Sequence, residues 1–207
     1  MFYVLVALGA YLIGSFPSGY LIARARGVDI RTMGSGNVGA TNVFRVLGKK
    51  WGYLCFALDI GKGALAVWLG WHVPVAWGLV PTTCAIISAC AVMIGHTFPV
   101  WLGFKGGKGI ATSGGIAIAL FPIEVFVISV SVWIIAFFVS RIVSVASLTG
   151  AFTLSILLVV DFVLGRADMA LMIVGIVMTA LVFWLHRGNL RRLRAGTEPR
   201  FERKRPV

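Results

Sequence analysis

The sequence is poor in the residues that build metal centres, disulfide frameworks and acidic catalytic pairs. Among its 207 residues are only seven acidic side chains, three histidines and three cysteines. Cys55, Cys84 and Cys90 lie in apolar runs without CxxC spacing, so we expect them to serve core packing. With so few histidines and no acidic pair, we expect neither a bound metal nor any other cofactor.

Two glycine-rich segments lack the context or spacing of nucleotide-binding motifs. Residues 34–45, GSGNVGATNVFR, formally match GxGxxG, but they follow an apolar run instead of a strand, and no βαβ unit is present. Residues 103–112, GFKGGKGIAT, fail the Walker A pattern, because counting from Gly103 places Lys108 where glycine is required. Dinucleotide binding and nucleotide hydrolysis are therefore not indicated.

Hydrophobic residues, by contrast, make up 59% of the chain. A soluble fold of this size could not bury so much apolar surface, which indicates a small polytopic membrane protein. We predict an all-α membrane bundle of seven transmembrane helices, at about 2–23, 51–71, 77–94, 110–121, 123–140, 144–164 and 169–185.

Two of these runs depart from a plain span. Ser15, Pro17, Ser18 and Gly19 interrupt the first run, which predicts a kink or a polar lining. The fourth run has about twelve residues and reaches only about 18 Å, well short of the roughly 30 Å hydrocarbon core. We therefore expect the glycine loop before it to dip into the membrane and the short helix to complete the crossing.

The formal net charge of +12 falls almost wholly on one side of this arrangement. That side holds 17 of the 19 Lys and Arg residues, whereas Arg166 lies opposite and Lys62 within a span. The bias predicts an amino terminus outside and a carboxyl terminus in the cytoplasm. The charge thus requires no nucleic acid, and anionic lipid headgroups explain the basic tail. We expect a monomer with one membrane domain at 1–193 and a basic tail at 194–207.

The loop at 103–112 combines bare backbone with positive charge. Its glycines remove side chains that would keep a ligand from the backbone amides, and its two lysines supply charge. An apolar helix-like run begins at Ile110, and its first amides would point at the loop without an internal acceptor. The loop therefore predicts a phosphate site whose residues are Lys105, Gly106, Gly107 and Lys108.

Residues 34–45 predict a second phosphate-binding loop. Small residues leave amides accessible, hydroxyl and amide side chains donate to oxygen, and Arg45 can bind a phosphate with two hydrogen bonds. The alternative is a glycine-rich turn with a basic residue at the lipid surface. The candidate ligands are Ser35, Gly36, Asn37, Thr41 and Arg45.

Two further groups lie near these loops and allow two interpretations each. His96 is the only histidine near both loops, and it is either a hydrogen-bonded structural residue or the acceptor of a hydroxyl proton. Asp59 and Lys62, three residues apart in one span, predict an internal ion pair, although Lys62 could instead extend the positive site.

The last polar groups on this side follow the fifth and seventh spans. Ser144 is either a helix-packing contact or a phosphate donor. His186, Asn189 and Arg192 recur at intervals of three, so they share a face if the helix continues. They could close the same pocket or belong to an interfacial helix whose basic side chains snorkel.

Four motifs, GSGNVGATNVFR, GHTFPVWLGFKGGKGIAT, RIVSVAS and HRGNLRRL, occur in this order. Through them the chain resembles the acyl-phosphate:glycerol-3-phosphate acyltransferase family of bacterial inner membranes. The resemblance runs from Tyr11 to Leu193, with Ile110 where we expect valine and Leu190 where we expect isoleucine. The tail lies outside it and receives no catalytic role. Trp101 stands where other glycerolipid acyltransferases carry the Asp of His-x4-Asp, which agrees with this family.

The resemblance implies transfer of a fatty acyl group from acyl phosphate to the 1-hydroxyl of glycerol 3-phosphate at the cytoplasmic face of the bacterial plasma membrane. The products would be lysophosphatidic acid and phosphate. The implied glycerol-3-phosphate ligands are Arg45, Lys105, His186 and Asn189, and the implied acyl-phosphate ligands are Ser35, Gly36, Asn37, Thr41 and Lys108. The implied catalytic residues are His96, Ser35 and Asn37, and either His96 or the donor's own phosphate would take the hydroxyl proton.

The rival function is a transporter of phosphate or organic anions. Such proteins commonly contain inverted repeats, and the echo between GKGA at Gly61 and GKGI at Gly107 is the only hint of one. The predicted ligand groups gather at one face, which favours interfacial chemistry over alternating access. A lipid-binding scaffold is least favoured, because it would not need two loops with exposed backbone.

Overall fold

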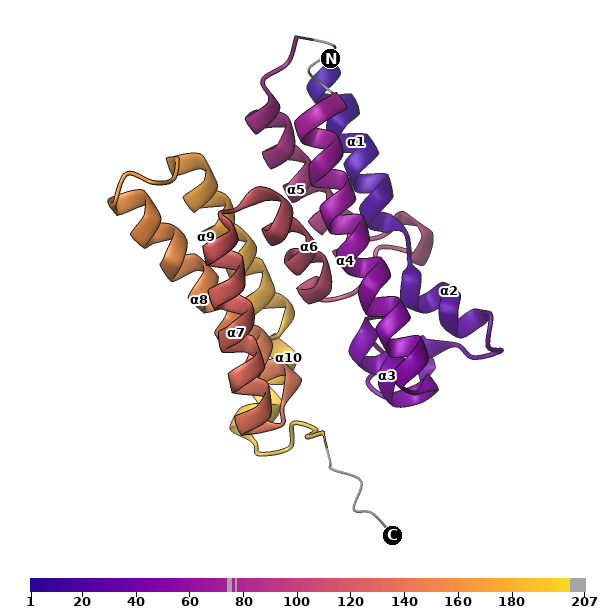
Figure 1. Cartoon of the computed structure of the whole chain (residues 1–207). Coiled ribbons are helices and arrows are strands. Elements are labelled where there is room, and N and C mark those ends of the chain that lie inside the picture. Colours follow the sequence, from indigo (N-terminus) through magenta and orange to yellow (C-terminus); the bar gives the residue numbers. More distant parts are fainter. Residues whose placement is uncertain (74–75, 77, 202–207) are drawn as a thin grey trace. The chain divides into compact units, whose positions relative to one another are not determined.

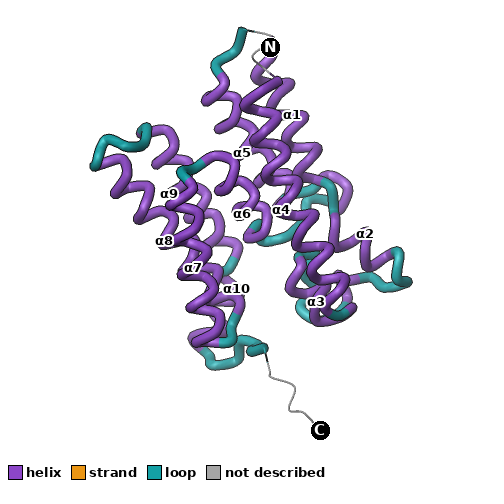
Figure 2. Tube along the Cα trace, viewed as in Figure 1, coloured by secondary structure: helices purple, strands orange, loops and turns teal. Residues whose placement is uncertain are grey.

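The computed structural model of the chain describes residues 1–73, 76 and 78–201, and these residues form helices and loops without a strand. Figure 1 follows the chain and Figure 2 separates helices from loops. The chain divides into two compact units, Met1–Phe121 and Pro122–Val207, called unit 1 and unit 2 below. The predicted all-α class is confirmed for the described residues.

Unit 1 is organised around one long helix, α4 (Figure 1). This helix packs against both α5 and α6, while α1 packs on α5 and α3 packs on α4. The elements of unit 1 are α1 (Phe2–Ser15), α2 (Ser18–Arg24), η1 (Ile30–Thr32), α3 (Ala40–Leu47), α4 (Lys49–His72), α5 (Pro81–Thr97), η3 (Val100–Leu102) and α6 (Ile110–Leu120).

Unit 2 consists of helices that pack in chain order, α7 on α8 and α8 on α9. Its elements are α7 (Ile123–Ser140), α8 (Val143–Val163), α9 (Met169–Leu185) and α10 (Arg187–Arg194). Each of the seven apolar runs predicted from the sequence is therefore helical in the described residues. Trp77, the predicted start of the third run, lies outside them, and the helix there begins at Pro81.

The first apolar run is broken where the sequence predicted a kink. α1 ends at Ser15 and α2 begins at Ser18, because Pro17 has no N–H to donate and disfavours a helical conformation at Phe16. Phe16 has ψ 114°, far from the helical value. Its carbonyl accepts hydrogen bonds from Ser18 N–H (3.1 Å) and from Lys62 Nζ (2.9 Å). The break thus supplies a main-chain acceptor to the interior of unit 1.

Length and hydropathy identify five candidate membrane spans in the described residues: Phe2–Arg24, Lys49–His72, Pro81–Leu102, Ile123–Ser140 and Val143–Val163. A sixth results if α9 and α10, which meet at 57°, count as one span. Only 11% of the α7 window is buried within the protein, as expected of a helix that faces lipid. α6 is apolar but has 11 residues, about 17 Å of helix.

Small residues let α4 and α6 approach each other closely. A Cβ atom on Gly63 would overlap the carbonyl oxygen of Thr112, and one on Gly115 would overlap that of Ile60. Membrane helices commonly pack through such small residues. The contact therefore depends on the absence of two side chains, one on each helix.

Gly63→Ala is expected to lower the free energy of unfolding by about 1–3 kcal/mol, because the added methyl group forces the two backbones apart. Gly61→Ala in the same helix is the matched control. A Cβ there would have nothing within 4 Å, so alanine should leave stability unchanged or raise it by up to about 1 kcal/mol. Thermal unfolding of both variants in one detergent checks this, and equal midpoints would contradict it.

Candidate active site

The loop that precedes α6 is fastened to the end of α5 through its backbone. The amide of Gly106 donates to the carbonyl of Thr97 (3.0 Å), and the amide of Gly107 donates to the carbonyl of His96 (3.1 Å). Gly109, with φ 79°, is the N-cap of α6, whose hydrogen bonding begins with Ser113 N–H to the Gly109 carbonyl (2.6 Å). The helix start predicted at Ile110 is confirmed. The amides just before Ser113 lie at a helix N-terminus, where anions bind favourably.

The glycines of this loop allow close packing on α5. A Cβ on Gly106 would overlap the carbonyl oxygen of His96, one on Gly107 would overlap its imidazole, and one on Gly109 would overlap Met93. The amides of Gly106 and Gly107 already donate to main-chain carbonyls. Close packing on α5, and not ligand access to these amides, therefore explains why both positions are glycine. The positive groups of the loop are Lys105, which is exposed, and Lys108, which is half-buried.

His96 lies at the end of α5 beneath this loop. Its side chain is 6% exposed, and Nε2 is the ring atom nearest to where a Gly107 Cβ would stand. Nδ1 is buried without a hydrogen-bond partner and lies 3.8 Å from Oδ1 of Asp59. The prediction that His96 lies near the lysine-containing loop is therefore confirmed. Its Nδ1 makes no hydrogen bond in this structure.

The loop at 34–45 is organised by one side chain, Asn42, which is 2% exposed. Its Oδ1 accepts from the amide of Ser35 (2.9 Å). Its Nδ2 donates to the carbonyls of Asn37 (2.9 Å), Met33 (3.0 Å) and Ile30 (3.3 Å). The Asn42 amide group thus connects the loop to the first turn of α3 and fixes the conformation of the loop backbone.

The predicted ligands of this loop remain at or near the surface. Ser35, Gly36 and Arg45 are exposed, whereas Asn37 and Thr41 are half-buried. Asn37 Oδ1 accepts from the amide of Gly39 (2.8 Å), as in an Asx turn. The sequence did not single out Asn42, since only its contacts distinguish it from the other polar residues of this loop.

Asn42→Asp is expected to lower turnover about tenfold and stability by about 1–3 kcal/mol. The substitution removes both N–H donors and turns a second acceptor oxygen towards the carbonyls that Nδ2 now binds. Turnover and thermal unfolding in detergent measure the two effects. Wild-type turnover and a wild-type unfolding midpoint would show that the backbone of the loop keeps its conformation without the Asn42 amide.

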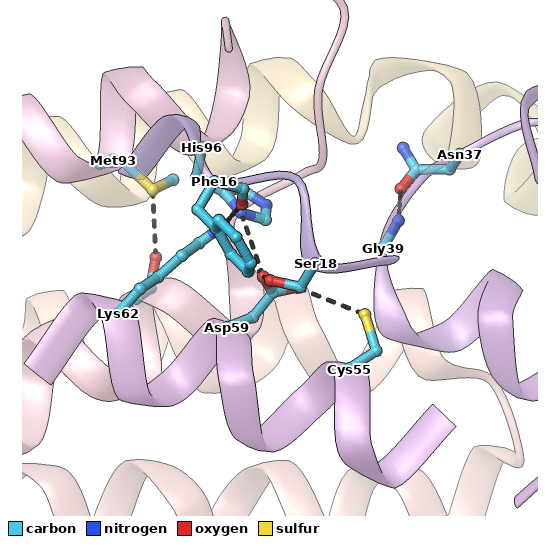
Figure 3. A network of polar contacts seen from close by, with 10 residues as sticks. Phe16, Ser18, Asn37, Gly39, Cys55, Asp59, Lys62, Met93 and His96 are labelled. Carbon is cyan, nitrogen blue, oxygen red and sulfur yellow. Dashed lines mark hydrogen bonds and ion pairs between the residues drawn. The ribbon is translucent and has the colours of Figure 1, made fainter. Parts of the chain in front are cut away.

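A buried polar network lies between the helix break, α4 and the end of α5 (Figure 3). Asp59 Oδ1 pairs with Lys62 Nζ (3.0 Å) and accepts from Ser18 Oγ (2.9 Å), while Lys62 also donates to the Phe16 carbonyl. The predicted ion pair between Asp59 and Lys62 is confirmed. These groups, together with His96 and with Val38 of the loop at 34–45, line one small pocket within unit 1.

Unit 2 holds a second polar cluster, centred on Glu198. One of its oxygens accepts from Ser144 Oγ (2.7 Å) and Asn189 Nδ2 (2.5 Å), and the other accepts from Arg192 Nε (2.7 Å). Ser144 and Asn189, both predicted substrate ligands, are thus brought together. His186 lies one turn before Asn189, and its Nδ1 donates to the carbonyl of Val182 (2.8 Å).

Glu198 is the residue that sequence reasoning missed, because the tail after Leu193 was assigned no role. Its side chain is 5% exposed. Burial raises its pKa, but hydrogen bonds from Asn189, Ser144 and Arg192 outweigh burial, so the pKa of this carboxyl lies below its ordinary 4.5. Two acidic residues, Glu198 and Glu202, within a strongly basic segment were the available signal.

The chain after Glu198 remains bound to unit 2. The amide of Phe201 donates to the Arg141 carbonyl (2.8 Å), and the Phe201 ring meets Phe137 edge to face. Ser147, which shares the RIVSVAS motif with Ser144, instead lies 3.5 Å from the indole nitrogen of Trp133. The contacts of Phe201 therefore place this segment on the turn between α7 and α8. Of the predicted tail at 194–207, residues 202–207 lie outside the described residues.

Comparison with known proteins places this chain in one family. Residues 4–196 match the family model described as glycerol-3-phosphate acyltransferase. A glycerol-3-phosphate acyltransferase of Synechococcus elongatus is 44% identical over 201 residues, covering 95% of this chain and 93% of the relative. One of Geotalea daltonii is 39% identical, covering 97% and 98%.

Solved structures agree with this assignment. The chain is similar to a crystal structure of PlsY, an integral membrane glycerol 3-phosphate acyltransferase, in its glycerol 3-phosphate form, with 39% identity, a TM-score of 0.86 and coverage of 98% of this chain and 96% of that one. The lysophosphatidic acid form of PlsY matches with 38% identity and a TM-score of 0.83. The protein is an integral, multi-pass membrane protein, and it belongs to the glycerol-3-phosphate acyltransferase family.

Proposed function

We propose that this protein transfers a fatty acyl group from acyl phosphate to the sn-1 hydroxyl of glycerol 3-phosphate. The hydroxyl oxygen attacks the acyl carbonyl carbon, an ester C–O bond forms, and the acyl carbon–oxygen bond to phosphate breaks. The products are lysophosphatidic acid and inorganic phosphate. The crystal forms of PlsY with glycerol 3-phosphate and with lysophosphatidic acid support this acceptor and this product.

One observation in this chain carries the assignment of the reacting groups. The imidazole of His96 packs directly on Gly107, within the loop that carries Lys105 and Lys108. A proton acceptor that packs on a loop with two lysines, just before a helix N-terminus, suits a reaction between two phosphorylated substrates, whose negative charges must be neutralised before they approach. Because acyl phosphate is already activated, positioning and charge neutralisation supply the rate without a covalent acyl-enzyme.

We assign the phosphate ligands by their chemistry. Glycerol 3-phosphate is bound by Arg45, Lys105, His186 and Asn189, and the acyl-phosphate headgroup is bound by Ser35, Gly36, Asn37, Thr41 and Lys108. Gly106, Gly107 and Ser144 shape these sites. Ser35 and Asn37 donate hydrogen bonds to the reacting phosphate, and His96 accepts the hydroxyl proton. His96→Ala tests whether His96 is the base. Near-normal turnover of this variant would mean that the phosphate of the donor accepts the hydroxyl proton instead.

The assay that tests the whole reaction measures phosphate release from palmitoyl phosphate with and without glycerol 3-phosphate. We expect release to require the acceptor and lysophosphatidic acid to form in step. Lys105→Ala should abolish both, whereas Lys49→Ala, which removes an exposed lysine at the start of α4, should retain them. Absence of release from folded wild-type protein would exclude the transferase and direct attention to phosphate transport in liposomes.

We further propose seven crossings, with the amino terminus outside, the carboxyl terminus in the cytoplasm and the phosphate ligands at the cytoplasmic face of a bacterial inner membrane. The bias of Lys and Arg supports this orientation. α6 and the loop before it would make the short crossing. Fluorescent-protein fusions after Val207 should fluoresce, because that reporter folds in the cytoplasm, and fusions at Gly165 should not.

We treat residues 1–193 as one catalytic domain and the protein as a monomer. The family match over residues 4–196, which includes residues of both units, supports the first assignment. Light scattering of the purified, active protein tests the second. A dimeric mass that accompanies all of the activity would require a different assignment.

A further inference from the structure

The ion pair of α4 lies inside a candidate membrane span and takes no part in the reaction as assigned above. The side chains of Asp59 and Lys62 are 4% and 7% exposed. Burying two charges costs free energy that their attraction often fails to offset. Ionisable residues inside membrane helices are accordingly rare, and their presence points to a function. The partners of the pair indicate what that function is.

Each charge of the pair binds one residue of the helix break, on either side of Pro17 (Figure 3). Lys62 Nζ donates to the Phe16 carbonyl (2.9 Å). Asp59 Oδ1 accepts from Ser18 Oγ (2.9 Å). A break in a membrane helix leaves main-chain groups without their helical partners, and in lipid a neighbouring helix must supply new ones. Lys62 supplies one, and Asp59 balances its charge at 3.0 Å. The pair thus fixes the turn between α1 and α2.

Gly19 connects this turn to the phosphate-binding loop at 34–45. It lies in the first turn of α2, and a Cβ atom there would overlap the carbonyl oxygen of Val38. The same Cβ would stand 3.0 Å from Val43 of α3 and 3.1 Å from Cys55 of α4. The loop, α3 and α4 therefore meet at one position, where only glycine lets the loop backbone approach so closely.

Val38 lies between residues that the proposed function assigns to the acyl-phosphate headgroup. Its neighbour Asn37 is one of them, and Thr41 follows in the first turn of α3. The side chain of Val38 is 8% exposed and belongs to a buried hydrophobic cluster with residues of α2, α3 and α4. Asn42 holds the loop from within, whereas Gly19 bounds it from the side of α2. A displaced Val38 would therefore move the candidate ligands with it.

We propose that Gly19, Lys62 and Asp59 are positioning residues of the transferase, which hold the loop at 34–45 through the turn between α1 and α2. The ion pair fixes that turn, and Gly19 fixes where Val38 can lie. The inference rests on the proposed function, because it takes this loop as the site of the acyl-phosphate headgroup. The three residues act on the loop and not on the substrate itself.

Hydrogen exchange of the full-length protein reports on the loop without any substrate. The amide of Ser35 donates to Asn42 Oδ1 (2.9 Å), which slows its exchange. In Gly19→Ala the displaced loop should exchange this amide about tenfold faster, because the hydrogen bond opens more often. Gly9→Ala in α1 is the matched control, since a Cβ there would have nothing within 4 Å. This control should leave the exchange unchanged.

Gly19→Ala should also raise KM for palmitoyl phosphate about tenfold, while kcat and KM for glycerol 3-phosphate change less than about threefold. Glycerol 3-phosphate is affected less because three of its four assigned ligands lie outside the loop: Lys105, His186 and Asn189. A merely unstable variant would behave differently, because loss of folded protein lowers the apparent kcat and leaves both KM values unchanged. The ratio of the two KM values therefore separates positioning from stability.

The double variant Asp59→Asn/Lys62→Met tests the ion pair. It leaves no buried charge, and the new amide oxygen can still accept from Ser18, so the variant chiefly removes the donor to Phe16. Exchange of the loop and the KM ratio should change in the same direction as in Gly19→Ala.

Arg166→Gln/Asp168→Asn is the matched control for the double variant. It removes one charge of each sign from exposed positions and should change neither readout. If the ion-pair variant fails to fold, Ser18→Ala removes one donor to the carboxylate, keeps both buried charges, and should give a smaller change of the same kind.

Unchanged exchange of the loop in folded Gly19→Ala would overturn the proposal. So would a lower apparent kcat with both KM values unchanged, or wild-type behaviour of the folded ion-pair variant. Failure of the wild-type protein to form lysophosphatidic acid would instead refute the proposed function. Hydrogen exchange would then still decide whether the turn positions the loop, so the two failures are distinguishable.

Discussion

Gly107→Ala is expected to lower kcat about a hundredfold while the protein stays folded. The new Cβ would overlap Nε2 of His96, so the imidazole must turn away from the loop, and misplacement of a reacting group by about 1 Å can cost a hundredfold in rate. The Gly107 amide, which donates to the His96 carbonyl, keeps the main chain from yielding instead. Formation of lysophosphatidic acid under saturating substrates measures the effect.

Two comparisons make this result specific. Gly114→Ala in α6 adds a methyl group where nothing lies within 4 Å, so it should leave kcat unchanged. In a His96→Ala background the overlap is gone, and Gly107→Ala should then add little further loss. Residues in contact give such non-additive effects, so full additivity would show that Gly107 acts through something other than the imidazole.

Glu198→Ala is expected to lower turnover at least tenfold and to destabilise unit 2 by about 2 kcal/mol or more. The carboxylate is the shared acceptor of Ser144, Asn189 and Arg192. Its loss removes this acceptor from the buried donors of Ser144 and Asn189. Turnover and thermal unfolding report the two effects. Glu124→Ala is the control, because it removes an exposed carboxylate from the first turn of α7. Equal behaviour of the two variants would contradict the role given to Glu198.

The stabilising effect of Glu198 should depend on pH. Its pKa is lower in the folded protein than the ordinary 4.5, so the folded state favours the ionised form. Its contribution is fully present above pH 4.5 and is lost as the pH falls through the folded pKa. The difference in unfolding midpoint between wild type and Glu198→Ala should therefore be constant near neutral pH and shrink below about pH 4.5. A difference that grows on acidification would reverse the sign of this linkage.

Much of the local structure follows from the sequence because it depends on nearest neighbours. Apolar runs must be helical in lipid, where every main-chain polar group needs a partner within its own segment. Pro17 breaks the first run for a reason contained in its own ring. The helix start at Ile110 and the Asp59–Lys62 pair depend on residues no more than a turn away. The motifs also predicted the family, because their order and spacing are specific.

The sites are different, because their decisive contacts join residues far apart in the chain. Nothing near Gly107 in sequence indicates that its amide binds His96 or that its missing side chain makes room for the imidazole. Nothing in the basic tail indicates that Glu198 accepts a hydrogen bond from Ser144, 54 residues earlier. The sequence by itself determined the helices, the membrane class and the chemistry available. Only the tertiary structure decided which donors meet which acceptors, because burial and long-range packing select one pairing among the many that composition allows.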